Sequence, residues 1–176
     1  DMCADIDELY WSRTIGPAVK ITRVGEGDAR RWLLSLVGTE SMTWRSTHNP
    51  ADIEANIRLM LGLEASMSVG VVRALHAAME RDGVPAERWP SEPVLICGHS
   101  QGGIVAAALA SVPACEAGVN VAGILSTGGP NRRIRVRPEV VTVAVYHDQD
   151  VVPSMDGSPD RAPDRRVAVG RSLVRP

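Results

Sequence analysis

A strand, a tight glycine-flanked turn and a helix follow one another directly in residues 94–110, which read VLICGHSQGGIVAAALA. The apolar residues before the turn and the apolar or small residues after it predict a buried strand followed at once by a buried helix. The turn holds Ser100 in the pattern G-x-S-x-G, which presents a serine in a strained conformation at the carboxyl edge of a sheet. Gly98 and Gly102 keep side chains out of the space around that serine, and Gly103 lets the helix pack close to the sheet.

This turn predicts that Ser100 is a nucleophile. The helix that begins behind Ser100 points its positive N-terminal end at the site, which favours the negative charge that develops in acyl transfer. A phosphate-binding or purely structural glycine turn is the alternative interpretation of the same residues. The order of apolar strand, turn and small-residue helix favours the nucleophile.

Strands and helices alternate along the rest of the chain, after a polar start. Strands are expected over 18–24, 30–37, 94–97, 119–129 and 139–147, with a further short strand or arm at 165–170. Helices are expected to begin at Asn49-Pro50, to cover 66–82 with an apolar stripe, and to follow Ser100 as far as Pro113. The strands over 119–129 and 139–147 lack alternation, which is typical of strands buried on both faces of a parallel sheet. These elements predict one α/β domain over residues 1–176, a three-layer sandwich with a mostly parallel sheet.

The stretch GHSQGG resembles the nucleophile elbow of the α/β-hydrolase superfamily, and the wider pattern resembles its class-three-lipase-like members. Three further landmarks occur in the order found in those enzymes: LLSLVGTES (33–41), STGGP (126–130) and YHDQDVVP (146–153). The resemblance implies an α/β-hydrolase-type fold. It also implies a serine esterase or lipase that cleaves carboxylic esters, lipid esters among them, through an acyl-serine intermediate.

The resemblance implies roles for four residues. Ser100 is the nucleophile, and the backbone N–H groups of Gln101 and Thr39 form the oxyanion hole, to which the Thr39 hydroxyl adds a donor. Asp150 is the triad acid, because its spacing to the proline in DVVP matches the family pattern. Asp148 competes for that role. A solvated turn residue is the alternative for either carboxylate, and a cap or loop hydrogen bond is the alternative for Thr39.

The catalytic histidine is missing from its expected place. The superfamily order is serine, acid, histidine, but the chain has four histidines, His48, His76, His99 and His147, and none follows Asp150. We expect His99 to pack or hydrogen-bond beneath the elbow and His48 and His76 to be structural or exposed. His147 ends the acid strand near the site, in the wrong order. The expectation is therefore that the base lies beyond residue 176 and that these residues are an incomplete part of the enzyme.

Composition and charge exclude several other classes of protein. A net charge of −2 gives no electrostatic support for binding nucleic acid, and no apolar run reaches the roughly 18 residues of a membrane span. Three irregularly spaced cysteines predict neither a disulfide framework nor a zinc site, and Cys97 is expected to be a buried free thiol. A cytoplasmic location is expected, with secretion as the alternative if a signal precedes Asp1.

The expected partner is a small-molecule or lipid-like ester, and no metal or organic cofactor is expected, because serine, imidazole and carboxylate suffice for the chemistry. Met42 and Trp44 make the loop after Thr39 apolar enough to contact such a substrate. The basic segment 131–138 is either a solvated edge or a site for an anion or phospholipid head group. Acyl transfer, thioester hydrolysis and a non-catalytic binding domain are the alternative functions.

Overall fold

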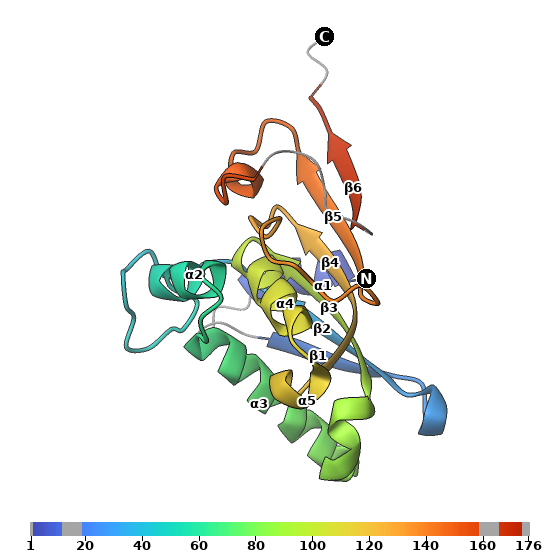
Figure 1. The fold of residues 1–176 in the computed structure, drawn as a ribbon. Helices are drawn as coiled ribbons and strands as arrows, with labels where there is room; N and C mark the ends of the chain where they lie inside the picture. The colour runs from blue at the N-terminus through green and yellow to red at the C-terminus, as the bar shows by residue number, and fades with distance from the viewer. Residues whose placement is uncertain (1, 12–18, 159–165, 174–176) are drawn as a thin grey trace.

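Helices lie on both sides of a six-stranded, mostly parallel sheet in the computed structural model, which describes residues 2–11, 19–158 and 166–173 (Figure 1). The helices are α1 (Met2–Trp11), α2 (Ile53–Met60), α3 (Ser66–Arg81), α4 (Gln101–Ser111) and α5 (Ala114–Ala117). The strands are β1 (Val19–Val24), β2 (Arg31–Leu36), β3 (Pro93–His99), β4 (Asn120–Thr127), β5 (Val141–His147) and β6 (Arg166–Arg171). Three short 3-10 helices are η1 (Gly27–Ala29), η2 (Ala86–Ser91) and η3 (Val152–Ser154). The predicted α/β architecture is confirmed as a mostly parallel sheet with helices on both sides.

The strands lie in the sheet in the order in which they occur in the chain, β1-β2-β3-β4-β5-β6. β1 runs antiparallel to β2, and every later neighbour is parallel. The register places Gly98 of β3 between Leu36 of β2 and Ser126 of β4. The carboxyl ends of β2 to β6 therefore meet at one edge of the sheet, where ligands of open α/β sheets bind.

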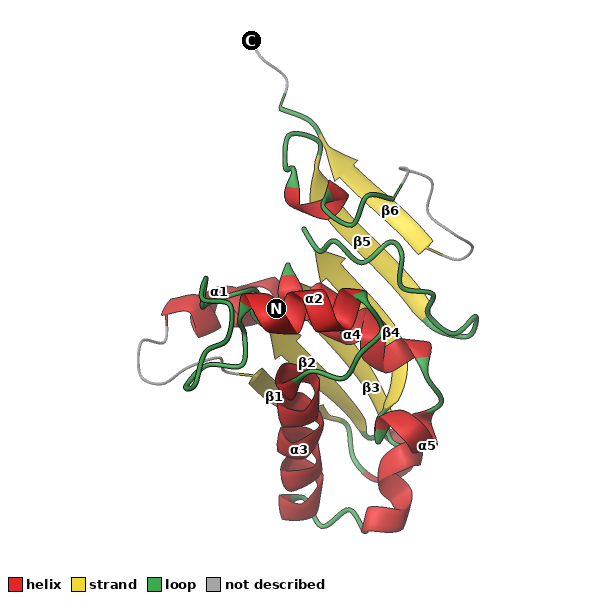
Figure 2. Ribbon diagram, turned by 60° about the vertical axis from the view of Figure 1, so that its left-hand side comes forward, coloured by secondary structure: helices red, strands yellow, loops and turns green. Residues whose placement is uncertain are grey.

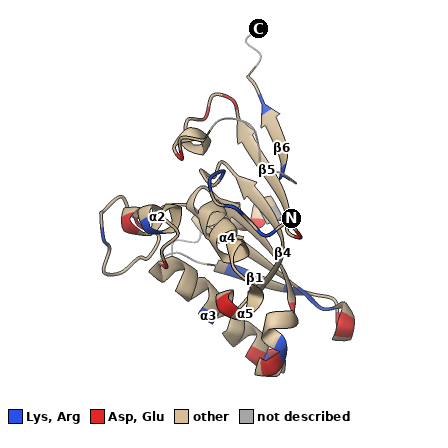
Figure 3. Cartoon of the chain, viewed as in Figure 1, with Lys and Arg blue, Asp and Glu red and all other residues tan. Residues whose placement is uncertain are grey.

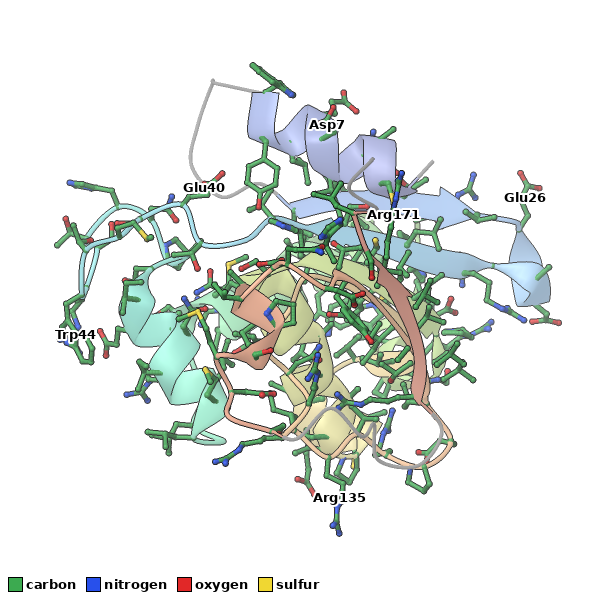
Figure 4. All side chains as sticks on the ribbon, turned by 90° about the horizontal axis from the view of Figure 1, so that it is seen from above. Asp7, Glu26, Glu40, Trp44, Arg135 and Arg171 are labelled. Atoms are coloured by element: carbon green, nitrogen blue, oxygen red, sulfur yellow. The ribbon has the colours of Figure 1, made fainter. Side chains whose placement is uncertain are left out.

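The two faces of the sheet are covered unequally. Helices α2 to α5 lie together on one face (Figure 2), and α1 lies on the opposite side of β1 and β2 from α2 and α4 (Figure 4). The core lies between the sheet and α3 and α4. The predicted stripe of α3 faces it, because Met67, Val71, Leu75 and Met79 are all buried.

Burial corrects one expectation about the last strands. β5 was expected to be buried on both faces, but Val141 is 59% exposed and Val145 is 37% exposed. The β6 residues paired with this face, Val167 and Val169, are also exposed. Among the described residues, α1 packs mainly on β1, β2 and β3, so it covers only the near half of this face of the sheet.

One helix was not expected, and another begins later than expected. The start of the chain, which was interpreted as a polar segment, forms α1. The helix expected from Asn49-Pro50 begins at Ile53, because the Asp52 side chain accepts the Ala55 N–H and caps it. Asn49 instead accepts the Ala51 N–H at 2.8 Å, which closes a turn before the helix.

Other local predictions are confirmed. The strand and helix around Ser100 occupy β3 and α4. β6 begins within the 165–170 segment and ends one residue beyond it, while Ala18 and Arg165 lie outside the described residues. Cys97 is a buried free thiol, and none of the three cysteines forms a disulfide. No helix in the described part of the chain is long and apolar enough to cross a membrane.

Candidate active site

Ser100 is the single residue between β3 and α4, and its backbone conformation is one that residues other than glycine rarely adopt. Its φ is 49° and its ψ is −113°, and it is the only non-glycine residue with a positive φ among the described residues. Such a conformation costs about 1–3 kcal/mol and persists only where the surroundings hold it. Here the Ser100 N–H donates to Thr127 O at 2.9 Å, and Ser100 O accepts the Gly103 N–H at 3.0 Å.

The glycines around Ser100 are required by close backbone contacts. A methyl group on Gly98 would lie 2.2 Å from the carbonyl carbon of Gly102, and one on Gly102 would lie 2.7 Å from Leu36 O. A methyl group on Gly103 would lie 2.4 Å from Oγ of Ser126 on β4. The structure therefore confirms the expected crowding around the glycines that flank Ser100.

The loop after β2 passes directly beside Ser100. A methyl group on Gly38 would lie 2.9 Å from Ser100 Cβ, so Thr39, the next residue, follows a segment in contact with the elbow. The Thr39 hydroxyl accepts a hydrogen bond from Asn56 Nδ2 of α2 at 2.8 Å. Because Asn56 supplies the donor in this bond, the Thr39 hydroxyl proton remains available to a substrate oxygen.

Gln101 contributes its backbone rather than its side chain. It is the first residue of α4, and N–H groups in the first turn of a helix have no partner within the helix. Its side chain is fully buried, and Nε2 donates to Asp52 O at 2.8 Å, which ties the start of α4 to the start of α2. Because Asn56 of α2 bonds the Thr39 hydroxyl, both segments expected to supply oxyanion donors are tied to α2.

The two candidate acids point in different directions. Asp150 Oδ1 accepts the Val152 N–H at 3.0 Å, and Oδ2 would lie 3.3 Å from a methyl group on Gly128, at the end of β4. Asp148 is exposed and accepts a hydrogen bond from the Ser172 hydroxyl, beyond β6. Asp150 therefore faces the strand next to β3, and Asp148 faces the outer edge of the sheet.

None of the four histidines, all of which are described, hydrogen-bonds the Ser100 hydroxyl. His48 is exposed, His76 stacks on Trp89, and His147 Nδ1 accepts the Gln149 N–H at 3.3 Å. His99 is hydrogen-bonded beneath the elbow as expected, through Nδ1, to the Tyr10 hydroxyl at 2.7 Å. Burial lowers the pKa of His99, and the Asp150 carboxylate acts in the opposite direction.

Two residues of the site escaped the sequence analysis. Tyr10, in the helix that was not anticipated, accepts the Gly38 N–H at 2.6 Å and contacts His99. Ile6 and Tyr10 are four positions apart, a spacing that places them on one face of a helix. This spacing was the sequence signal for the packed face of α1, on which Ile6 is buried. Asn56 was within a predicted helix, but no sequence pattern connects it to Thr39.

The loop between β2 and α2 carries exposed apolar side chains. Met42 is 82% exposed and Trp44 is 63% exposed, and Figure 4 shows Trp44 at the outer side of this loop. Arg45 anchors the loop through Glu54, with nitrogen–oxygen distances of 2.5 and 2.8 Å. The loop is therefore held to α2 while its apolar residues face outward.

The basic segment 131–138 is held by hydrogen bonds to two other parts of the chain. The backbone N–H groups of Arg132 and Arg133 donate to Asp156, and Arg137 donates to Val121 O. In Figure 3 this basic segment crosses in front of α4, with acidic and basic segments interspersed elsewhere in the same view.

One groove of the molecule lies away from Ser100. It has a volume of about 790 Å³ and lies between the α2–α3 connection, α4 and Arg133–Arg135. Ser100 does not line it, so the groove is no part of the candidate site. Among the described residues, no group of three or more His, Cys, Asp or Glu side chains is arranged to hold a metal ion.

No protein-family model, curated protein or solved structure matches this chain. The class that the structure defines is an α/β protein with a mostly parallel sheet and a strained serine at its carboxyl edge.

Proposed function

We propose that this protein is a serine hydrolase of the α/β-hydrolase type that cleaves carboxylic esters, lipid esters among them. The observation that carries the proposal is the strained Ser100, held between a strand and a helix N-terminus with the Gly38–Thr39 segment against it. Residues in sparsely populated backbone conformations cluster at functional sites. A purely structural turn would place glycine at this position, where serine stores strain.

The reaction follows acyl-transfer chemistry. Ser100 Oγ attacks the ester carbonyl carbon, the Oγ–C bond forms, and the hydroxyl proton passes to a base. The tetrahedral oxyanion receives hydrogen bonds from the backbone N–H groups of Thr39 and Gln101 and from the Thr39 hydroxyl. Collapse breaks the bond to the alcohol, which leaves with the proton, and water then releases the acid from Ser100.

Asp150 is proposed as the acid that orients the imidazole base. Support comes from its carboxylate, which faces Gly128, whereas Asp148 is hydrogen-bonded to Ser172. None of the four histidines hydrogen-bonds the Ser100 hydroxyl, so the proposal does not assign the imidazole base to a residue.

The apolar side chains at the same edge support an apolar acyl group. Met42 and Trp44 follow β2, and Val151 and Met155, which are 73% and 69% exposed, follow β5. These loops extend from the carboxyl ends of strands on either side of β3 and β4. Their exposure favours esters with an apolar chain over small polar esters.

Ester turnover tests the proposal. The full-length protein should hydrolyse p-nitrophenyl butyrate, and Ser100→Ala should abolish that turnover. Ser111→Ala is the matched control, because Ser111 lies at the far end of α4 and donates to Ala108 O. Turnover that survives in Ser100→Ala contradicts the proposal. Added alcohol acceptors distinguish acyl transfer, which yields a new ester, from hydrolysis.

A non-catalytic binding domain is the second candidate, favoured by the lack of a histidine hydrogen-bonded to Ser100. It predicts saturable binding of an ester analogue without turnover in the full-length protein. Turnover that depends on Ser100 excludes it.

A further inference from the structure

The hydroxyl of Tyr10 connects three parts of the candidate site. It accepts the backbone N–H of Gly38 at 2.6 Å and lies 2.7 Å from Nδ1 of His99. The Tyr10 and His99 rings meet edge to face, with centroids 5.7 Å apart. One phenol from α1 therefore contacts both the segment that leads to Thr39 and the residue before Ser100.

The proton positions in this network follow from the partners. The Gly38 N–H can only donate, so Tyr10 Oη is the acceptor in that bond. Burial raises the pKa of Tyr10, so the hydroxyl keeps its own proton. This proton is free to donate to His99 Nδ1.

The Asp150 carboxylate favours a hydrogen bond in which the Tyr10 hydroxyl donates to His99 Nδ1. A methyl group on Gly128 would lie 3.3 Å from Asp150 Oδ2 and 3.8 Å from His99 Nε2, so both atoms lie against the same backbone. A carboxylate nearby stabilises an N–H rather than a lone pair on Nε2. His99 then carries its proton on Nε2 and accepts at Nδ1, and the network runs from Gly38 through Tyr10 to His99 in one direction.

We propose that Tyr10 is a positioning residue of the Ser100 site, whose hydroxyl holds Gly38–Thr39 in place for the oxyanion and holds His99 in the Nε2–H tautomer. This role rests on the proposed function. Gly38 is packed tightly between Tyr10 and Ser100, because a methyl group on it would lie 2.8 Å from Tyr10 Oη and 2.9 Å from Ser100 Cβ.

Removal of the hydroxyl leaves the Gly38 N–H without its partner, and the loop shifts to find another. A displacement of about 1 Å in a catalytic group costs roughly 100-fold in rate. We therefore expect Tyr10→Phe to lower kcat by about 10- to 100-fold with little change in KM, because the oxyanion donors act on the transition state.

The test compares Tyr10→Phe with Tyr146→Phe in the full-length protein. Tyr146 is the other tyrosine of the chain and its ring lies under Arg132, so the control removes the same atom from a different place. Two experiments are carried out. Steady-state kinetics give kcat and KM for p-nitrophenyl butyrate, and NMR gives the ¹⁵N chemical shifts of the His99 ring, which report the tautomer. Ser100→Ala supplies the background rate.

Tyr10→Phe should lower kcat and shift the His99 signals toward a mixture of tautomers, while Tyr146→Phe changes neither. Unchanged kcat in Tyr10→Phe, or equal losses of kcat in both variants, overturns the positioning role while leaving the proposed function intact. Wild-type His99 signals that show Nδ1–H overturn the assigned direction of the network. Turnover in the wild type that is no greater than in Ser100→Ala overturns the proposed function, and the positioning role with it.

Discussion

The side-chain amide of Asn56 donates a hydrogen bond to the hydroxyl of Thr39 across 2.8 Å. Asn56 lies on α2 and Thr39 lies in the loop after β2, so the bond fixes the hydroxyl rotamer from a separate element. A hydroxyl that accepts from an amide retains its own proton for donation. This relationship makes the contribution of the Thr39 side chain testable apart from its backbone N–H.

Thr39→Val removes the hydroxyl and keeps the shape of the side chain. Loss of one oxyanion donor lowers kcat by about 100-fold or more, and we expect that loss here with KM nearly unchanged. Thr39→Ser, which keeps the hydroxyl, should retain most of the activity, and Asn56→Ala should fall between the two. Steady-state kinetics with one ester check the order, and Thr39→Val at wild-type kcat contradicts the donor role.

Gly98→Ala should prevent the elbow from closing. Its methyl group would lie 2.2 Å from the backbone of Gly102, a contact that no side-chain movement relieves. Gly70→Ala on α3 is the matched control, because nothing lies within 4 Å of the added methyl group. We expect Gly70→Ala to raise the free energy of unfolding by about 0.5–1 kcal/mol and Gly98→Ala to lower it severely. Urea denaturation measures both, and equal stabilities would show that the elbow is not as tight as described.

A buried ion pair holds the start of β3. Both Glu92 carboxylate oxygens accept from Arg30, at 2.8 and 3.0 Å, and the Trp32 indole donates to one of them at 3.3 Å. Glu92→Gln removes the nearer counter-charge of the largely buried Arg30 and leaves Asp82 at 3.6 Å, so we expect a loss of about 1.5–3 kcal/mol. The exposed Glu87→Gln is the control. Thermal unfolding at neutral pH should separate the two variants.

The same carboxylate predicts a pH dependence. The hydrogen bonds from Arg30 hold the pKa of Glu92 below its usual value near 4.5. The folded-state pKa is therefore lower than the unfolded-state pKa, so the contribution of Glu92 to stability is complete above about pH 4.5 and is lost as the pH falls through the folded-state pKa. The stability difference between wild type and Glu92→Gln should shrink on acidification below pH 4.5, and a difference that grows there contradicts the assignment.

Cysteine reactivity tests the packing of β3. Burial raises the pKa of Cys97 to about 12, so almost no thiolate forms at pH 8. Iodoacetamide should modify the exposed Cys3 and Cys115 and leave Cys97 unmodified until the protein is unfolded. Rapid labelling of Cys97 in the native protein contradicts its place in the core.

If none of the four histidines serves as the base, residues 1–176 should hydrolyse p-nitrophenyl butyrate barely above background. A site that lacks its base retains about 10³- to 10⁴-fold acceleration over water, a small part of the usual total. His147→Ala is the informative variant, because His147 ends β5 three residues before Asp150. Robust activity of residues 1–176 that His147→Ala removes would show that the base was among the four histidines.

The sequence predicted features that depend on residues within one helix, strand or turn, and it did not predict contacts between distant elements. The elbow and the stripe of α3 were predictable, because glycine spacing and apolar periodicity act within one element. The contact of Tyr10 with Gly38 was not, because it joins residues 28 positions apart through a helix that was interpreted as a polar segment. The exposure of Val141 and Val145 also depends on where α1 lies, which no pattern within β5 records.

Covalent labelling of Ser100 tests the central claim most directly. A fluorophosphonate forms an Oγ–P bond with an activated serine and releases fluoride, so the mass of the full-length protein increases by one adduct. The account predicts one adduct, which peptide mapping places on Ser100 and which is absent from Ser100→Ala but present in Ser111→Ala. An unlabelled wild-type protein, or an adduct that persists in Ser100→Ala, would contradict the claim that Ser100 is the nucleophile.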